Sequence, residues 1–507
     1  MNYNSILRGK RVLNHEGARA YKLSPEMELY SAVVTASLSN LFYEKQDDRV
    51  DRISTLVGKV APEFVAQLAV YTRNVMNLRS IPLLLVVELA KVHSGDDLVS
   101  RTVAKVVKRA DEIMELLMCY QWRNPNYRNS NKKLSSLSSQ IKKGLQMAFN
   151  NFDEYQFAKY NRSNLEVKLR DALFLIHPKA KDENQQAIFD KIASDTLDVP
   201  YTWEVELSAL GQNQFKNERE KKLAFARKWA ELIHSEKVGY MALMRNLRNM
   251  LETQVSHSDM KMVCNRLADP AQVAKSKQLP FRFLSAYREM EYVNSLSTKA
   301  VMQALESAVM VSASNINGFD ENTRVLLASD VSGSMYTPIS ARSTVRLYDV
   351  GLLLSMLFRN TCDQVIAGIF GDRWKVVNLP TNNVLAATRR LNKMEGEVGY
   401  STNGYKVIDW LIKEKKVMDK VMMFTDLQMW DSSGYNKEFE TSWMQYKKIA
   451  PEAKLYLFDL AGYGQTPLRV ESHDVYLIAG WSDRIFDVLA ALEKGNDALD
   501  VIKSVEI

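Results

Sequence analysis

The pattern of apolar and polar positions divides the chain into two parts. From about residue 24 to about residue 310, apolar residues recur every three or four positions, which is typical of amphipathic helices. The first such run, Leu29 to Ala36, follows Ser24-Pro25-Glu26, and a serine cap, a proline and an acid mark the start of a helix. Prolines at 62 and 82 open two more helices. Further helices are predicted near 96–119, 135–149, 153–160, 164–175, 184–195, 217–234, 238–252, 258–267 and 281–289.

Short loops join these helices, and such a run resembles an α-solenoid of HEAT type, in which stacked helix pairs bury a shared core. No strict sequence repeat is visible, so this prediction depends on the regular succession of predicted helices and short loops.

The pattern changes after residues 311–322, which are rich in Ser, Asn and Gly and indicate a domain boundary. Short apolar runs then alternate with amphipathic ones, which predicts a doubly wound α/β sheet. The predicted strands are 324–329, 364–370, 374–379, 420–425, 454–459 and 474–479. The predicted helices are 344–359, 383–393, 404–416, 438–448 and 483–493. We therefore expect a helical domain at 1–320 and an α/β domain at 321–507, with Val501 and Ile502 in the tail packing back onto the fold.

The amino-acid composition indicates the class of protein to expect. The 507 residues are 46% hydrophobic and 25% charged, as in soluble globular proteins, and no apolar run is long enough to span a bilayer. Residues 1–10 lack the apolar core of a secretory signal. The three cysteines are odd in number and far apart, which favours a reducing compartment over disulfides or a zinc cluster. We expect a cytoplasmic, monomeric protein.

The net charge of +7 is unevenly distributed. Residues 321–507 carry 22 basic and 24 acidic side chains, whereas residues 101–181 alone carry 16 basic and 7 acidic ones. Such a local excess fits a polyanion partner such as nucleic acid, and a solvated basic helix face is the alternative.

The first candidate site follows the strand predicted at 324–329. In Asp330-Val331-Ser332-Gly333-Ser334, a carboxylate and two hydroxyls at alternate positions can turn three oxygens toward one point. Open α/β sheets bind ligands at this end of their strands, and hard divalent cations prefer such oxygens. Taken alone, the motif is more often just a turn.

Two later features strengthen the metal prediction. Thr402 precedes the amphipathic run from Tyr405 to Ile412, and Asp426 ends a second buried strand. The set resembles the metal-ion-dependent adhesion site of von Willebrand factor A domains. This resemblance assigns five ligand positions, Asp330, Ser332, Ser334, Thr402 and Asp426. It implies a divalent cation, with Mg²⁺ expected and Mn²⁺ as the other candidate. The alternative is a metal-free domain used only for packing.

Catalytic motifs are not evident. Haloacid dehalogenases use a second acid two residues after the nucleophilic aspartate, and Ser332 stands at that position here. There is no P-loop lysine motif, and no Ser-His-acid or Cys-His group stands in a recognisable context. We expect a protein that is not an enzyme, although a metal-dependent hydrolase remains an alternative class.

A second candidate site lies at 152–162, where aromatic residues alternate with Lys159 and Arg162. Cations can neutralise phosphates while aromatic rings stack on exposed bases. The alternative is that Phe152, Tyr155 and Phe157 belong to a helix core and the cations are solvated.

The amino-acid sequences of several segments strongly resemble the TROVE module of Ro proteins. They are 158–162, Leu169-Arg170-Asp171, His177-Pro178-Lys179, 240–250 and 275–283, and the adhesion-type domain follows in the family's order. The resemblance covers nearly the whole chain and is closest to bacterial Ro orthologues.

The resemblance implies a ring of helical repeats closed by the von Willebrand A domain. A basic outer face would bind small Y RNAs, and a central hole would accept single-stranded 3′ ends of misfolded noncoding RNA for quality control. The resemblance to Ro proteins also implies three Y RNA contacts, Lys159, Arg162 and His177. A bound Y RNA could tether an exoribonuclease. The competing class is a metal-dependent protein-adhesion scaffold that binds no RNA.

Overall fold

The computed structural model describes residues 11–36, 44–124, 137–161, 165–314, 316, 319–340, 343–435, 437–470, 474–482, 484–495 and 497–507. The chain forms two compact units, and the boundary between them falls within α2 (Gln46–Val57). Unit 1 comprises residues 1–50 and 213–498, and unit 2 comprises residues 51–212 and 499–507. The predicted boundary at 320, which follows a change of sequence pattern, divides the chain in a different way and stays a prediction.

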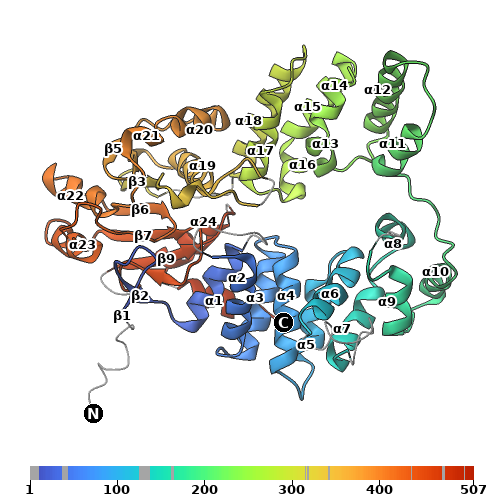
Figure 1. The fold of residues 1–507 in the computed structure, drawn as a ribbon, viewed down its shortest axis with the longest axis horizontal. Helices are drawn as coiled ribbons and strands as arrows, with labels where there is room; N and C mark the ends of the chain where they lie inside the picture. The colour runs from blue at the N-terminus through green and yellow to red at the C-terminus, as the bar shows by residue number, and fades with distance from the viewer. Residues whose placement is uncertain are drawn as a thin grey trace. The chain divides into compact units, whose positions relative to one another are not determined.

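Unit 2 is helical. Its helices are α3 (Pro62–Asn74), α4 (Ser80–Val92), α5 (Leu98–Val106), α6 (Asp111–Trp122), α7 (Ser139–Phe149), α8 (Glu154–Tyr160), α9 (Leu169–Ile176), α10 (Glu183–Ser194) and α11 (Trp203–Gly211). Helices near in sequence pack on one another, as α3 on α4 and α5 on α7 (Figure 1). A Cβ at Gly144 of α7 would lie 2.4 Å from Cβ of Val103, so glycine permits the close approach of α5 and α7. This arrangement confirms the predicted stack of helices.

The C-terminal tail packs onto unit 2, as predicted. It contains α25 (Ala498–Lys503), in which Ile502 is buried. The side-chain amide of Gln67 donates to the carbonyl of Lys503 at 2.6 Å, and Nζ of Lys105 donates to the carbonyl of Glu506 at 2.9 Å.

Unit 1 contains the remaining helices of the first part of the chain. They are α1 (Pro25–Val34), α12 (Glu218–His234), α13 (Tyr240–Arg245), α14 (Leu247–Glu252), α15 (His257–Ala268), α16 (Pro270–Ser276), α17 (Pro280–Met290) and α18 (Thr298–Ser312). The single helix predicted at 238–252 is wrong, because α13 and α14 meet at Asn246. The side chain of Asn246 donates to the carbonyl of Ala242 at 2.9 Å, and such local bonding competes with a continuous helix.

Unit 1 also holds the predicted sheet, whose six strands run in the order β5-β4-β3-β6-β7-β9. They are β3 (Arg324–Asp330), β4 (Gln364–Phe370), β5 (Trp374–Val376), β6 (Lys420–Thr425), β7 (Lys454–Asp459) and β9 (Val475–Ala479). All neighbours pair in parallel except the edge strand β5.

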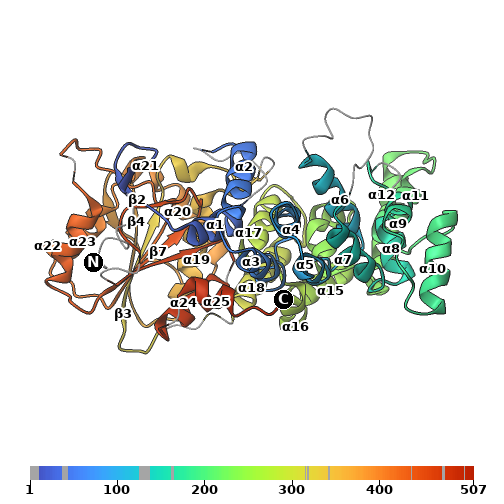
Figure 2. The ribbon, with the colours of Figure 1, turned by 90° about the horizontal axis from the view of Figure 1, so that it is seen from below.

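The helices that alternate with these strands are α19 (Leu347–Arg359), α20 (Val384–Asn392), α21 (Glu395–Val398), α22 (Tyr405–Lys413), α23 (Phe439–Lys447) and α24 (Ile485–Glu493). Helix α19 packs on β3 and β6, and α22 and α23 lie side by side (Figure 2). The predicted doubly wound fold is confirmed. Among the described residues, no helix combines the length and the apolar content that a membrane crossing requires.

Residues 11–34 of unit 1 pack against this α/β part of the chain. Strands β1 (Arg11–Leu13) and β2 (Arg19–Lys22) form a hairpin, and β2 pairs with β8 (Gln465–Thr466). In α1, the hydroxyl of Tyr30 donates to the carbonyl of Ala479 in β9 at 3.1 Å. The sequence pattern predicts no strand here, because strands of three or four residues are too short to show a period.

Candidate functional site

The predicted metal ligands lie where three loops meet at the carboxyl ends of β3 and β6. The parallel register pairs Ser329 with Phe424, so Asp330 and Asp426 follow at the same edge of the sheet. The N–H of Gly333 donates to the carbonyl of Tyr400 at 2.8 Å. The N–H of Trp430 donates to the carbonyl of Thr402 at 3.2 Å. These two bonds join the three loops that the sequence singles out.

Hydrogen bonds fix the side chain of Asp330. Its Oδ1 accepts from the N–H of Ser332 at 2.9 Å, and its Oδ2 accepts from the hydroxyl of Thr425 at 2.6 Å. The hydroxyls of Ser332 and Ser334 lie 3.4 Å apart. All five predicted ligand side chains are buried, namely Asp330, Ser332, Ser334, Thr402 and Asp426.

The two carboxylates are buried near each other. Burial raises the pKa of Asp330, and burial together with the charge of Asp330 raises the pKa of Asp426. Neither takes part in an ion pair among the described residues, and Oδ2 of Asp426 is buried without a hydrogen-bond partner. An uncovered carboxylate oxygen beside a second acid and several hydroxyls fits a hard divalent cation. In the described chain no cluster of three or more His, Cys, Asp or Glu offers a different kind of metal site.

The loop after Asp426 is held by residues that the sequence pattern did not single out. The N–H of Gln428 donates to Oδ1 of Asp426 at 3.0 Å, and Leu427 between them has φ of +65°. A bulky residue at positive φ is strained, so other contacts must hold it there. Asn14 supplies one, since its side-chain amide donates to the carbonyl of Met429 at 2.8 Å. The only hint in the sequence is the polar Gln428 within an otherwise apolar run.

Exposed aromatic rings are found in the same three loops. Tyr336, Tyr400 and Tyr435 are 44%, 58% and 87% exposed. The guanidinium of Arg346 lies 3.1 Å from the centroid of the Tyr336 ring. Exposed tyrosines are typical of protein-binding surfaces.

The predicted RNA contacts belong to unit 2. Lys159 is exposed near the end of α8, with its Nζ 5.8 Å and 5.7 Å from the ring centroids of Tyr155 and Tyr160. His177 is exposed and ends α9 in the left-handed conformation, with φ of 49°. Arg162 lies outside the described residues.

The structure divides the aromatic residues at 152–157 between a buried core and the surface. Phe152 and Phe157 are buried in the helix core, where their rings contact each other edge to face. Tyr155 is 44% exposed. A further pair that the sequence reasoning missed lies on α9, where the exposed ring of Phe174 is 5.7 Å from the guanidinium of Arg170. The i, i+4 spacing of Arg170 and Phe174 is the sequence feature that could have predicted this contact.

Comparison with known families accounts for both parts of the chain. A TROVE domain model matches residues 26–225 and 196–342, and a Ro60 vWA domain model matches residues 324–492. The chain belongs to the Ro family. The resemblance seen in the sequence is thereby confirmed, and the von Willebrand A match contains all five candidate ligands.

Two relatives of this Ro family member are distant from it in sequence. It is 23% identical to mouse telomerase protein component 1 over 357 residues, covering 54% of this chain and 13% of that protein. It is 24% identical to RNA-binding protein RO60 of Deinococcus radiodurans over 278 residues, covering 51% of this chain and 50% of the other. The matched chain therefore spans at most half the length of these relatives.

A solved structure extends the likeness to the whole fold. The crystal structure of the Deinococcus radiodurans RO (RSR) protein matches with a TM-score of 0.60 at 18% identity. The match covers 93% of this chain and all of that one. It supports a common fold of helical repeats and an α/β domain.

Proposed function

We propose that this Ro family member binds RNA through unit 2 and acts as part of a ribonucleoprotein. The observation that carries the proposal is the exposed cation of Lys159 beside Tyr155 and Tyr160, with a second exposed pair, Arg170 and Phe174, on the next helix. Lysine neutralises phosphate, and exposed rings stack on unpaired bases. Two relatives are named as an RNA-binding protein and a telomerase protein component, which agrees with this class.

The resemblance to Ro proteins makes the proposal more specific. Small structured Y RNA would bind at the surface that bears Lys159 and His177, and single-stranded 3′ ends of misfolded RNA would enter a central hole. Discrimination would then depend on RNA shape and a free end rather than on a base code. A Y RNA could also tether an exoribonuclease for quality control.

The test is RNA recovery and binding by the full chain. The protein is purified at low salt, its RNA is sequenced, and binding to a Y-type hairpin is measured between 50 and 300 mM salt. We expect Lys159→Ala/His177→Ala to bind more weakly and to reduce the salt slope by about one unit, because the lysine contact is lost. Lys59→Ala, an exposed charge of the same unit, is the control. RNA binding that is equal in all three proteins would overturn this assignment of the surface.

We also propose that the five buried side chains in unit 1 hold a divalent cation, Mg²⁺ or alternatively Mn²⁺. Asp330 and Asp426 would supply charge, and Ser332, Ser334 and Thr402 would supply hydroxyl oxygens. When bound, the ion offers a Lewis-acid position to an acidic side chain of a protein partner. The exposed Tyr336, Tyr400 and Tyr435 would contact that partner. In this proposal the site binds a cation and a protein partner and does not catalyse a reaction.

Metal content measured on the purified protein tests this second proposal. Asp330→Ala should lose the ion and any partner held through it, while RNA binding by unit 2 stays unchanged. Unchanged metal content in Asp330→Ala would contradict the ligand assignment. Turnover of a phosphoester substrate that is lost in the same variant would favour the hydrolase class instead.

A further inference from the structure

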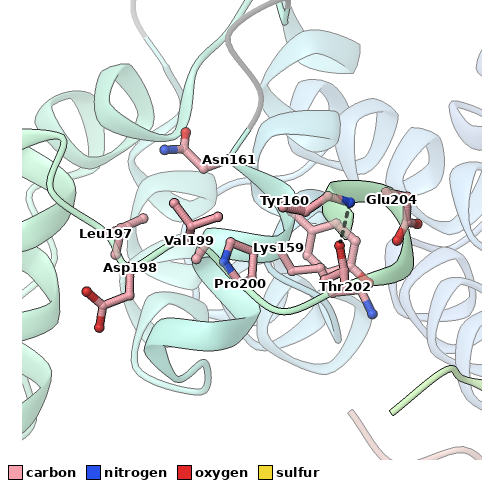
Figure 3. A pocket seen from close by; sticks show the side chains of 11 residues that line it. Lys159, Tyr160, Asn161, Leu197, Asp198, Val199, Pro200, Thr202 and Glu204 are labelled. Carbon is pink, nitrogen blue, oxygen red and sulfur yellow. Dashed lines mark hydrogen bonds between the residues drawn. The ribbon is translucent and has the colours of Figure 1, made fainter. Parts of the chain in front are cut away.

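A cavity of about 380 Å³ lies beside Lys159 (Figure 3). It lies between the end of α8 and the segment from Leu197 to Val205, which leads into α11. Small-molecule sites begin at roughly 300 Å³, so this cavity has room for a single planar heterocycle with part of its sugar. Neither the family resemblance nor the comparisons assign a role to it.

The lining combines an apolar surface with polar groups. Ala158, Val199 and Pro200 supply apolar atoms, and the side chains of Val199 and Pro200 lie in the middle of the view in Figure 3. In this view Asn161 lies above them, and Glu204 lies to their right, beyond Tyr160 and Thr202. Apolar surface with a few polar groups is the usual composition of a site for a small heterocycle.

Contacts within unit 2 hold the cavity wall in place. Nζ of Lys191 contacts both carboxylate oxygens of Glu154 at 2.8 Å, and Glu154 accepts from the N–H of Asp198 at 3.2 Å. The hydroxyl of Thr202 accepts from the N–H of Val205 at 3.3 Å and caps α11. The wall therefore exists before any ligand binds, which lowers the conformational cost of binding.

Cations lie at the edge of the cavity. The Tyr160 ring has the guanidinium of Arg109 at 4.7 Å from its centroid and Nζ of Lys159 at 5.7 Å. The guanidinium of Arg109 is paired with Asp111 at 2.9 Å, so Lys159 is the cation that would face the phosphate of a nucleotide whose base enters the cavity. Glu204 is exposed and forms no ion pair among the described residues, so its carboxylate is available to hydrogen-bond donors.

We propose that this cavity takes one unpaired base of a bound RNA and that it prefers guanine. Guanine presents two adjacent N–H donors, which one carboxylate can accept together, as Glu204 would. Uracil presents a single donor between two acceptors, and those acceptors would face the negative charge. The inference rests on the proposed RNA function of unit 2 and adds a base preference to it.

The experiment uses the full chain and RNA hairpins that are identical except for one bulged nucleotide, G, A, C or U, or none. Fluorescence anisotropy gives the Kd of each. We expect the G bulge to bind about tenfold more tightly than the U bulge, the scale of one bidentate base contact. In Glu204→Gln this ratio should fall to near one, because the amide offers only one acceptor.

A second variant fills the cavity. Val199 is 80% exposed, so Val199→Trp should fold normally and should reduce binding of the G bulge to that of the hairpin without a bulge. Glu183→Gln, an exposed position on α10, is the matched control and should keep the wild-type ratio.

The outcomes separate this inference from the proposed function. Equal affinity for bulged and unbulged hairpins, or a preference for U, would overturn the inference while RNA binding that depends on Lys159 remained. Failure of the wild type to bind any hairpin would instead overturn the proposed function.

Discussion

The backbone N–H of His15 donates a hydrogen bond of 2.9 Å to Oε1 of Gln428. Gln428 in turn donates its own backbone N–H to the carboxylate of Asp426 at 3.0 Å. The turn between β1 and β2 is thereby connected, through one buried glutamine, to a candidate metal ligand. Residues 14–15 thus help to position the candidate metal site at the end of the sheet.

Gln428→Ala keeps the backbone N–H that donates to Asp426 but removes the side-chain bonds to the N–H of His15 and to the carbonyl of Asp426. Because these bonds hold the loop that positions Asp426, the variant should weaken Mg²⁺ binding by about tenfold, the scale of outer partners that orient metal ligands. Isothermal titration of the full chain with MgCl₂ measures the change. Gln445→Ala, at an exposed position on α23, should bind Mg²⁺ as the wild type does. Equal affinity in both variants would show that the hairpin plays no part in the site.

Asp426→Asn should abolish Mg²⁺ binding and raise the thermal stability of the metal-free protein. The raised pKa of Asp426 reflects a buried charge beside Asp330, and a neutral amide of the same shape avoids that repulsion. Melting temperatures in EDTA and in Mg²⁺ measure both effects. A variant that is less stable than the wild type in EDTA would contradict the argument.

Arg288→Met should destabilise unit 1 by about 3 kcal/mol, because it leaves a buried carboxylate without its cation. Arg288 of α17 forms two hydrogen bonds with Asp349 of α19, at 2.7 Å and 2.6 Å, and Asp349 is fully buried. Arg248→Met breaks the exposed pair with Glu252 and should cost less than about 1 kcal/mol. Denaturant unfolding compares the two, and similar losses would contradict the prediction.

The stability of unit 2 should fall when the pH drops below about 4.5 because of Glu88. Burial alone would raise the pKa of Glu88, but hydrogen bonds from Ser54, Lys91 and Arg123 outweigh it and lower the pKa from 4.5. Below about pH 4.5 the unfolded chain therefore binds more protons than the native chain. The stabilisation that ionised Glu88 provides above this pH is lost as the pH falls through the pKa of Glu88 in the native state.

Glu88→Gln should remove this pH dependence and should be less stable than the wild type at pH 7, since Lys91 and Arg123 lose their carboxylate. Thermal unfolding between pH 3.5 and 7 provides the measurement, with Glu63→Gln on the surface of α3 as control. An unchanged acid slope in Glu88→Gln would place the titrating group elsewhere.

Strongly periodic elements were predictable from the sequence. The bounds of β4 and of β6 agree with the predicted strands residue for residue, since a short apolar run with polar ends suits only a buried parallel strand. Ser24 caps α1 as predicted, accepting from the N–H of Met27 at 3.3 Å. These features depend on neighbours within a few residues, so the sequence contains the information that specifies them.

The candidate metal site was predictable for a related reason. Asp330 and Asp426 each end a predicted strand, and the rule that parallel strands bring their carboxyl ends together needs no knowledge of distant contacts. Pairing within the sheet then places the two acids at one edge, although occupancy by an ion stays a prediction.

The sequence by itself therefore determined the helical repeats, the alternating sheet and the residues that end its strands. Only the tertiary structure decided the role of residues 11–22, the bond from His15 to Gln428, and the cavity between Lys159 and Glu204. Those features depend on contacts between segments far apart in the chain. No local period encodes such contacts, because their stability comes from surfaces that meet only after the chain has folded.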